Sequence, residues 1–112
     1  MGQGKRIDFD KRIDFDKRKF IRVTREVIDN TDKLTKPVDI AVYAVLCMYA
    51  DNKSKESFPS IATIASKARC SERVAQRSLA SLEDAGYIEI SRRYDRNGFQ
   101  TSNMYVLLDT ES

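Results

Sequence analysis

Apolar residues recur at helical spacing between Ser71 and Gly86, and mostly polar residues fill the opposite side. Because residues three and four apart share one face of a helix, this pattern predicts an amphipathic helix over 71–85. Ser71 is a suitable N-cap, and Gly86 can end the helix in the left-handed conformation. The predicted buried face holds Ala75, Ser78, Leu79 and Leu82, with Val74 at its edge, and the opposite face holds Arg73, Gln76, Arg77 and Ala80.

A more apolar helix is predicted over about 35–50. Thr35 is the expected N-cap, Pro37 fits the first turn, and Asp39 complements the helix dipole there. Since the remaining sides of this helix are also apolar, we expect it to be central and to pack on several faces. Its main stripe is expected to comprise Val38, Ala41, Val42, Val45, Met48 and Tyr49.

A short helix is predicted directly after Pro59, with Ser60 as its N-cap. Its apolar stripe comprises Ile61, Ile64 and Ala65, and the pattern stops at 68–70. Only a short turn then separates it from the helix over 71–85.

The C-terminal part of the chain alternates in the manner of strands. Residues 87–94, YIEISRRY, and 101–108, TSNMYVLL, flank a segment that contains Asn97 and Gly98. An Asn-Gly pair between two alternating runs predicts a β-hairpin.

The N-terminal region is less regular. A short strand over about 20–24, a turn or short helix over 25–29 and a polar loop over 51–57 are expected. The hexapeptide KRIDFD occurs at 5–10 and again at 11–16. We expect a flexible charged arm, although a strand or helix that pairs with a partner, a functional peptide motif and a duplication without a role remain alternatives. The expected division is an arm over 1–19, a domain over 20–108 and a tail over 109–112.

Composition narrows the chemistry. The chain of 112 residues has no histidine and two cysteines, with 41% hydrophobic and 33% charged residues. Histidine is the usual general base and a common zinc ligand, so we expect no enzyme activity, no cofactor and no metal site. Cys47 and Cys70 are expected to be buried thiols. No apolar run is long enough to cross a membrane and no signal peptide is recognisable, so a cytoplasmic location is expected.

Positive charge is unevenly distributed, although the net charge is only +3. One basic group comprises Lys67, Arg69, Arg73 and Arg77, with Glu72 as the only acid among them, and another comprises Arg92, Arg93 and Arg96, with Asp95. Segregated positive charge favours an anionic partner.

The order of helix, short helix, turn, helix, strand, basic turn and strand is typical of a winged helix-turn-helix. The segment FPSIATIASKARCSERVAQRSLASLEDAGYIEISRR, followed by NGFQTSNMYVL, resembles the winged helix-turn-helix domains of bacterial, plasmid and phage replication initiators, replisome organisers and transcription regulators. The resemblance covers roughly 20–108. It implies a mainly helical α+β fold, with a three-helix core and a C-terminal β-hairpin wing, to which the short strand at 20–24 would be an addition.

By this resemblance, 71–85 is the recognition helix and 92–101 the wing. The family usually has glycine in the turn where this chain has Arg69, and a left-handed non-glycine residue there costs about 1 kcal/mol. Either the turn differs, or Arg69 is retained because its side chain contacts phosphate. Cys70 is expected to fill the buried position of the turn, and Val74 occupies a position that is frequently polar.

We therefore expect sequence-specific binding of double-stranded DNA, in transcription regulation, replication or plasmid maintenance. Recognition would involve Arg73, Gln76 and Arg77, backbone positioning would involve Ser60, Lys67, Arg69 and Ser71, and the wing would contribute Arg92, Arg93 and Arg96. A homodimer is expected, because small modules usually bind in pairs. The alternative is a protein-interaction module of the same fold, which engages a replication or regulatory protein through residues 1–30.

Overall fold

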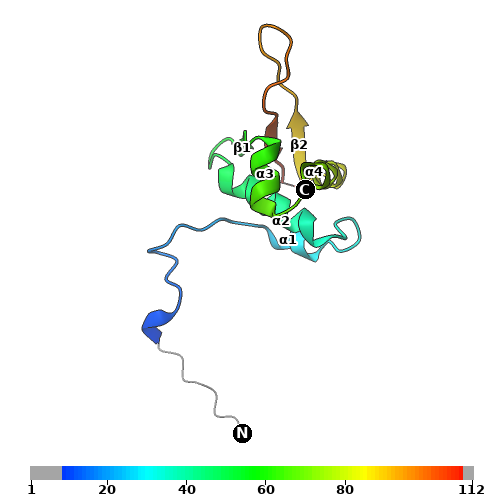
Figure 1. Ribbon diagram of the computed structural model, residues 1–112. Helices are drawn as coiled ribbons and strands as arrows, with labels where there is room; N and C mark the ends of the chain where they lie inside the picture. Colours follow the sequence, from blue (N-terminus) through cyan, green and yellow to red (C-terminus); the bar gives the residue numbers. More distant parts are fainter. Residues whose placement is uncertain (1–8, 110–112) are drawn as a thin grey trace.

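The computed structural model describes residues 9–109 (Figure 1). A 3-10 helix over Phe9–Lys11 precedes four α-helices and three strands in the described part of the chain. The elements are α1 (Arg25–Asp29), α2 (Pro37–Tyr49), β1 (Glu56–Ser57), α3 (Ile61–Ala68), α4 (Glu72–Asp84), β2 (Ile88–Ser91) and β3 (Met104–Leu107).

Helix α2 begins one residue later than its expected cap implies. Its N-cap is Lys36, so the prediction of Thr35 as the cap was wrong. Pro37 occupies the first helical turn as predicted, and the Asp39 side chain reaches back to accept a hydrogen bond from the Lys36 backbone N–H at 3.3 Å. A side chain at the third helical position thereby satisfies a donor near the helix start, which removes the need for a threonine cap.

Helix α2 is central, as predicted, and packs against α3, α4, β1 and β3. The predicted stripe was wrong at its end, because Met48 and Tyr49 are exposed. The last turn of α2 thus leaves two apolar side chains uncovered within the described structure. The residues of α2 that are buried are Asp39, Val42, Tyr43, Val45 and Leu46.

The ends of α3 and α4 follow the sequence closely. The Ser60 and Ser71 hydroxyls accept hydrogen bonds from the backbone N–H groups of Thr63 and Val74, which confirms both as N-caps. Gly86 has a φ of 85°, and two backbone hydrogen bonds from Gly86 and Tyr87 close the end of α4 in a Schellman arrangement.

The turn between α3 and α4 places Arg69 in the left-handed region, with φ 59° and ψ 50°. The turn therefore has the conformation that favours glycine, although the residue is arginine. Cys70 donates its backbone N–H to the Ala65 carbonyl at 3.0 Å. Cys47 and Cys70 are free thiols that are only half-buried, so the prediction of two buried cysteines was wrong.

The three strands form an antiparallel sheet in the order β1-β3-β2. The expected strand at 20–24 is absent, because residues 19–24 have no regular secondary structure. The additional strand is β1, which lies in the segment 51–57 that was predicted to be a polar loop. Its register pairs Ser57 with Tyr105.

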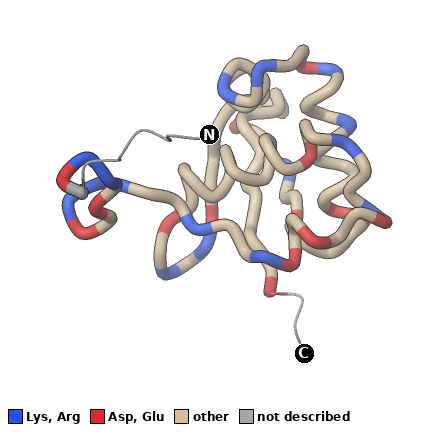
Figure 2. The backbone as a smooth tube through the Cα atoms, turned by 90° about the horizontal axis from the view of Figure 1, so that it is seen from below, with Lys and Arg blue, Asp and Glu red and all other residues tan. Residues whose placement is uncertain are grey.

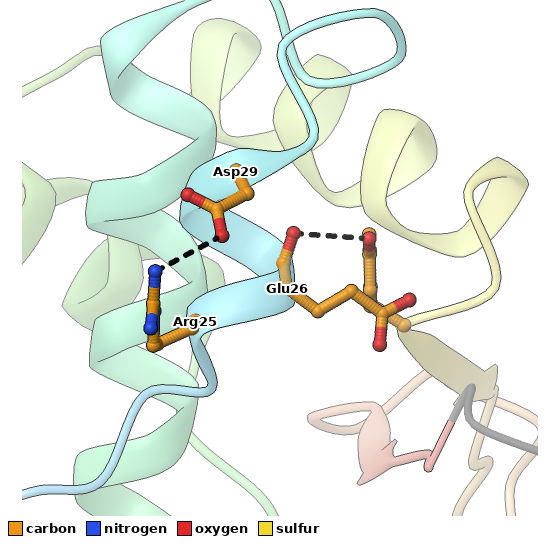
Figure 3. Close-up of polar contacts among 4 residues, drawn as sticks. Arg25, Glu26 and Asp29 are labelled. Atoms are coloured by element: carbon orange, nitrogen blue, oxygen red, sulfur yellow. Dashed lines mark hydrogen bonds and ion pairs between the residues drawn. The ribbon is translucent and has the colours of Figure 1, made fainter.

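Helix α1 is held to the domain by the side chain of Tyr87. The Tyr87 hydroxyl donates to the Glu26 carbonyl at 3.4 Å and accepts from the Asn30 side-chain amide at 3.0 Å. Figure 3 shows the Glu26 carbonyl and, beside it, the Arg25–Asp29 ion pair of 3.9 Å across one turn of α1. Of the turn or short helix that was predicted over 25–29, the structure has the helix.

The hydrophobic core joins α1, the three larger helices and the sheet. Its largest fully buried apolar side chains are Val27, Val42, Leu46, Ile64, Leu82 and Ile88. Three helices, a short strand after the first of them and a C-terminal hairpin confirm the predicted α+β winged helix-turn-helix fold. Ahead of α1 the chain leads away from this body, and basic and acidic positions follow one another along it (Figures 1 and 2).

Candidate nucleic-acid interface

The exposed side of α4 is the first component of the interface. Its buried seam comprises Ala75, Ser78, Leu79 and Leu82, as predicted. On the opposite side Arg73, Gln76, Arg77 and Ala80 are all exposed. Within residues 9–109, neither Arg73 nor Arg77 forms an ion pair. Two guanidinium groups and an amide are therefore presented to solvent with their hydrogen-bond donors available.

A buried hydrogen bond fixes the orientation of α4 against α2. The Ser78 hydroxyl donates to Asp39 Oδ1 at 2.7 Å, and the two residues are 2% and 3% exposed. The second oxygen of Asp39 accepts from the Lys36 backbone N–H. Because this polar contact sits in the seam between the helices, it specifies one rotation of α4 more narrowly than apolar packing does.

The turn residues are partly committed to the turn itself. The hydroxyls of Ser60 and Ser71 cap helices, and Ser60 also donates to the Thr63 hydroxyl at 2.9 Å. The Arg69 guanidinium donates to the Lys67 carbonyl at 3.0 Å. Lys67, Arg69 and Ser71 are exposed and lie at the end of α3 or the start of α4, whereas Ser60 is half-buried at the start of α3.

The wing ends in a structured loop at Asp95–Phe99. Asp95 donates its backbone N–H to the Phe99 carbonyl at 2.8 Å, and Gly98 donates to the Asp95 carbonyl at 3.1 Å. The Asp95 side chain accepts two further hydrogen bonds, from the backbone N–H groups of Asn97 and Phe99, each at 2.9 Å. Gly98 has a φ of 83°. The predicted Asn-Gly turn is confirmed as a three-residue loop with a left-handed glycine.

A bulge separates the wing from the regular sheet. Ser91 pairs with Met104, and the next bridge joins Tyr94 to Gln100. Residues 92–93 therefore lie opposite 101–103, which contain one more residue. Such a bulge bends the hairpin and increases its twist. In Figure 1 the hairpin, coloured orange, projects beyond the helices and the three-stranded sheet.

The arginines of the wing point to different sides. Arg92 lines a groove beside α4, whereas the Arg93 guanidinium lies 4.9 Å from the centroid of the Phe58 ring. Side chains alternate along a strand, so consecutive arginines occupy opposite faces. Arg96 is exposed in the loop. The second basic group seen in the sequence is thus divided between two faces and the tip.

The groove has a volume of about 560 Å³ and lies between α4 and the wing. Gln76 and Glu83 line it from α4, Ser60 from the start of α3, and Tyr105 from the sheet. Four consecutive polar residues also line it: Gln100, Thr101, Ser102 and Asn103. They were not assigned to the site in the sequence analysis, although the polar run QTSN was visible there.

Two side chains in the groove are constrained by their surroundings. Burial raises the pKa of the Tyr105 phenol, against a smaller opposing effect of Asn103 and Arg92, so the phenol is neutral at physiological pH. Glu83 accepts a hydrogen bond from the Ile90 backbone N–H at 3.2 Å, which engages its carboxylate at the free edge of β2. Away from the groove, burial raises the pKa of Tyr43 to about 12 and that of Cys47 to about 11.

Residues 9–109 contain no group of three or more His, Cys, Asp or Glu side chains placed to hold a metal ion. In the same part of the chain, no helix has the length and apolar character needed to span a membrane.

A short helix, a tight turn, an exposed second helix and a flanking hairpin define a winged helix-turn-helix fold. Residues 36–88, from the N-cap of α2 to the first residue of β2, match the family model of a helix-turn-helix domain. No curated protein and no solved structure matches the chain significantly. A helix-turn-helix domain suggests DNA binding.

Proposed function

We propose that the protein binds double-stranded DNA sequence-specifically, with α4 in the major groove and the wing against the backbone or the minor groove. The observation that carries this proposal is the exposed polar face of α4, whose arginines have no acidic partner within residues 9–109. The major groove admits one α-helix, so α4 can enter it. The proposed role is in transcription regulation, replication or plasmid maintenance.

Base recognition is assigned to Arg73, Gln76 and Arg77. Arginine pairs with the edge of guanine and glutamine with that of adenine, each through two hydrogen bonds. The three side chains are at i, i+3 and i+4 on one helix face, so they reach neighbouring positions of one groove.

Backbone contacts are assigned to the turn and the wing. Lys67 and Arg69 are exposed cations at the end of α3, while Ser60 and Ser71 mark the starts of α3 and α4. Arg92, Arg93 and Arg96 would meet phosphates or a narrow minor groove. Four to six phosphate contacts predict a slope of about −4 to −5 in a plot of log affinity against log salt concentration.

The test is selection of bound duplexes from a random pool at a fixed salt concentration, followed by measurement of affinity for the selected and for random duplexes. Arg77→Ala is expected to reduce the preference between them, whereas Arg93→Ala weakens binding to both alike. Arg25→Ala is the matched control, because it removes one positive charge from α1, outside the interface. A selection that yields no enriched sequence contradicts the proposal.

A homodimer on a palindromic site would double the contacts. The exposed Met48 and Tyr49 at the end of α2 offer apolar surface for such a contact. Light scattering with and without the selected duplex, together with the symmetry of the selected sequence, tests this part of the proposal.

A second candidate function is docking to another protein through the N-terminal arm. Ile13 and Phe15 are 71% and 61% exposed, in a segment of alternating apolar and charged residues. Such a segment can add a strand to a partner's sheet. Failure to bind random duplex at low salt favours this candidate over the first.

A further inference from the structure

The wing carries two large aromatic side chains that are mostly exposed in the described structure. Tyr94 is 61% exposed and Phe99 is 71% exposed. Tyr94 forms the last bridge of the hairpin, with Gln100, and Asp95 and Phe99 form the next pair. The two rings therefore stand on adjacent rungs, and the alternation of a strand places them on opposite faces of the hairpin.

The tip is held rigidly by its own hydrogen bonds. Four bonds converge on Asp95, two through its main chain and two through its side chain. Gly98 adopts the left-handed conformation that the loop requires. Ordering the aromatic residues on binding is consequently inexpensive, because their backbone is already fixed.

The charge around the tip is positive. Arg92, Arg93 and Arg96 lie within four residues of one ring or the other, and the single acid of this segment, Asp95, is engaged by two backbone N–H groups. A ligand that is complementary to this surface has negative charge, for the arginines, beside flat apolar faces, for the rings. Nucleotides have both, since a phosphate adjoins each base, and aromatic rings in a basic setting are a stacking platform for unpaired bases.

We propose that the wing tip stacks on DNA bases that have left the double helix, so that the protein prefers a duplex containing an unpaired segment to a continuous one. The inference rests on the proposed function in one respect: α4 anchors the domain on the adjoining duplex. A thin hairpin with one ring on each face fits between two separated strands, where Tyr94 meets one strand and Phe99 the other.

Three DNA probes of the same sequence test the proposal. The first is a duplex of about 30 base pairs, which is about three helical turns. The second is the same duplex with a central bubble of about six unpaired nucleotides, a length within the range of small single-strand binding sites. The third is one strand alone. The affinity ratio between bubble and continuous duplex is the readout. Full-length protein is expected to prefer the bubble. Phe99→Ala and Tyr94→Ala are each expected to lower that preference by about five- to hundred-fold, or to abolish it where the preference itself is smaller.

The control for a lost apolar surface is Ile28→Ala, because Ile28 is 55% exposed on α1 and outside the wing. This variant keeps the preference. Phe99→Tyr retains an aromatic ring and keeps it as well. Circular dichroism checks that each variant is folded, and Tyr94→Ala gives a decision if Phe99→Ala does not fold.

A direct measurement uses the absence of tryptophan from the sequence. Phe99→Trp introduces a single tryptophan at the tip, and stacking on a base quenches its emission. Quenching is expected with the bubble and not with the continuous duplex, whereas Ile28→Trp is quenched by neither.

The outcomes separate the two proposals. Equal affinity for bubble and duplex overturns the stacking proposal and leaves duplex recognition standing. Binding of the bubble without the continuous duplex supports stacking and contradicts duplex recognition, and binding of no probe contradicts both. A preference that survives Phe99→Ala and Tyr94→Ala together overturns the assignment of these residues, and points to the exposed rings as a contact for a protein.

Discussion

Substitution of Ser78 by alanine tests how the α4 surface is held in place. The hydroxyl of Ser78 is the partner of Asp39 Oδ1 at 2.7 Å, and both residues are almost completely buried. Ser78→Ala removes the donor and leaves a side-chain oxygen of Asp39 without that bond, in a place with little room for water. The remaining contact of Asp39, with the Lys36 N–H, involves the other oxygen.

The expected loss follows from this geometry. Leaving a buried acceptor without its partner costs about 1–3 kcal/mol, and more when the acceptor is charged. Alanine returns a few tenths of a kcal/mol, roughly 0.5 at most, because it favours helix more than serine does. The net expectation is a decrease of about 2 kcal/mol in the free energy of unfolding, a large part of the roughly 5–15 kcal/mol that stabilises a typical domain.

Urea unfolding followed by circular dichroism measures this decrease. Ser81→Ala is the matched control on the same helix, since the Ser81 hydroxyl donates only to the Arg77 carbonyl one turn earlier, at 3.1 Å, in a half-buried position. Its effect should remain within about 0.5 kcal/mol. Joining Ser78→Ala with Asp39→Ala should cost less than the sum of the two single changes, because no unpaired oxygen is left.

Two results would refute this reasoning. Equal stabilities of Ser78→Ala and Ser81→Ala would mean that the bond between α2 and α4 contributes little to holding α4. A changed dependence on urea concentration would mean that the substitution acts on the unfolded chain as well.

The remaining predictions concern the interface, the turns and the thiol. Arg77→Ala should cost about 1–3 kcal/mol of binding to the selected duplex if its contact is bidentate, with a smaller loss on random duplex, as titrations at one salt concentration will reveal. Arg69→Gly should raise the free energy of unfolding by up to about 1 kcal/mol, because it relieves a left-handed arginine, and a loss of stability in urea would contradict this. Gly98→Ala meets no atom within 4 Å but places a side chain at φ +83°, so the melting temperature should fall through backbone strain alone. Burial raises the pKa of Cys47 to about 11 from 9.0, so unfolded protein loses this proton first and stability should decline from about pH 9 to 11; Cys47→Ala should show a shallower decline.

The helical part of the fold could be predicted because its determinants are local. The seam of α4 comprises residues three and four apart, and Ser60, Ser71 and Gly86 each act on the turn beside them. Thr35 failed as a cap for a reason that is local too. The Asp39 side chain accepts from the Lys36 N–H and so stabilises a helix that starts after Lys36. Residue preferences alone do not decide between a cap at Thr35 and a cap at Lys36.

The sheet was harder to predict because it depends on distant residues. Strand β1 is two residues long, and its pairing of Ser57 with Tyr105 joins positions separated by almost half of the chain. A segment of polar residues gives no sign of such a partner. Met48 and Tyr49 fit the apolar stripe of α2 but are exposed. Their exposure depends on where the neighbouring elements end, and the periodicity of a single helix gives no information about that.

The wing shows how one local feature redistributes side chains that form a single cluster in the sequence. Without the bulge, continuing the register of Ser91 and Met104 would pair Tyr94 with Thr101; the observed partner is Gln100. Because one inserted residue exchanges the faces of every later position on that strand, it decides which polar side chains turn toward α4. On the other side of the hairpin, the Arg93 guanidinium lies over the aromatic ring of Phe58. The direction and chemical character of the wing thus depend on the length of segment 101–103 as much as on the arginines themselves.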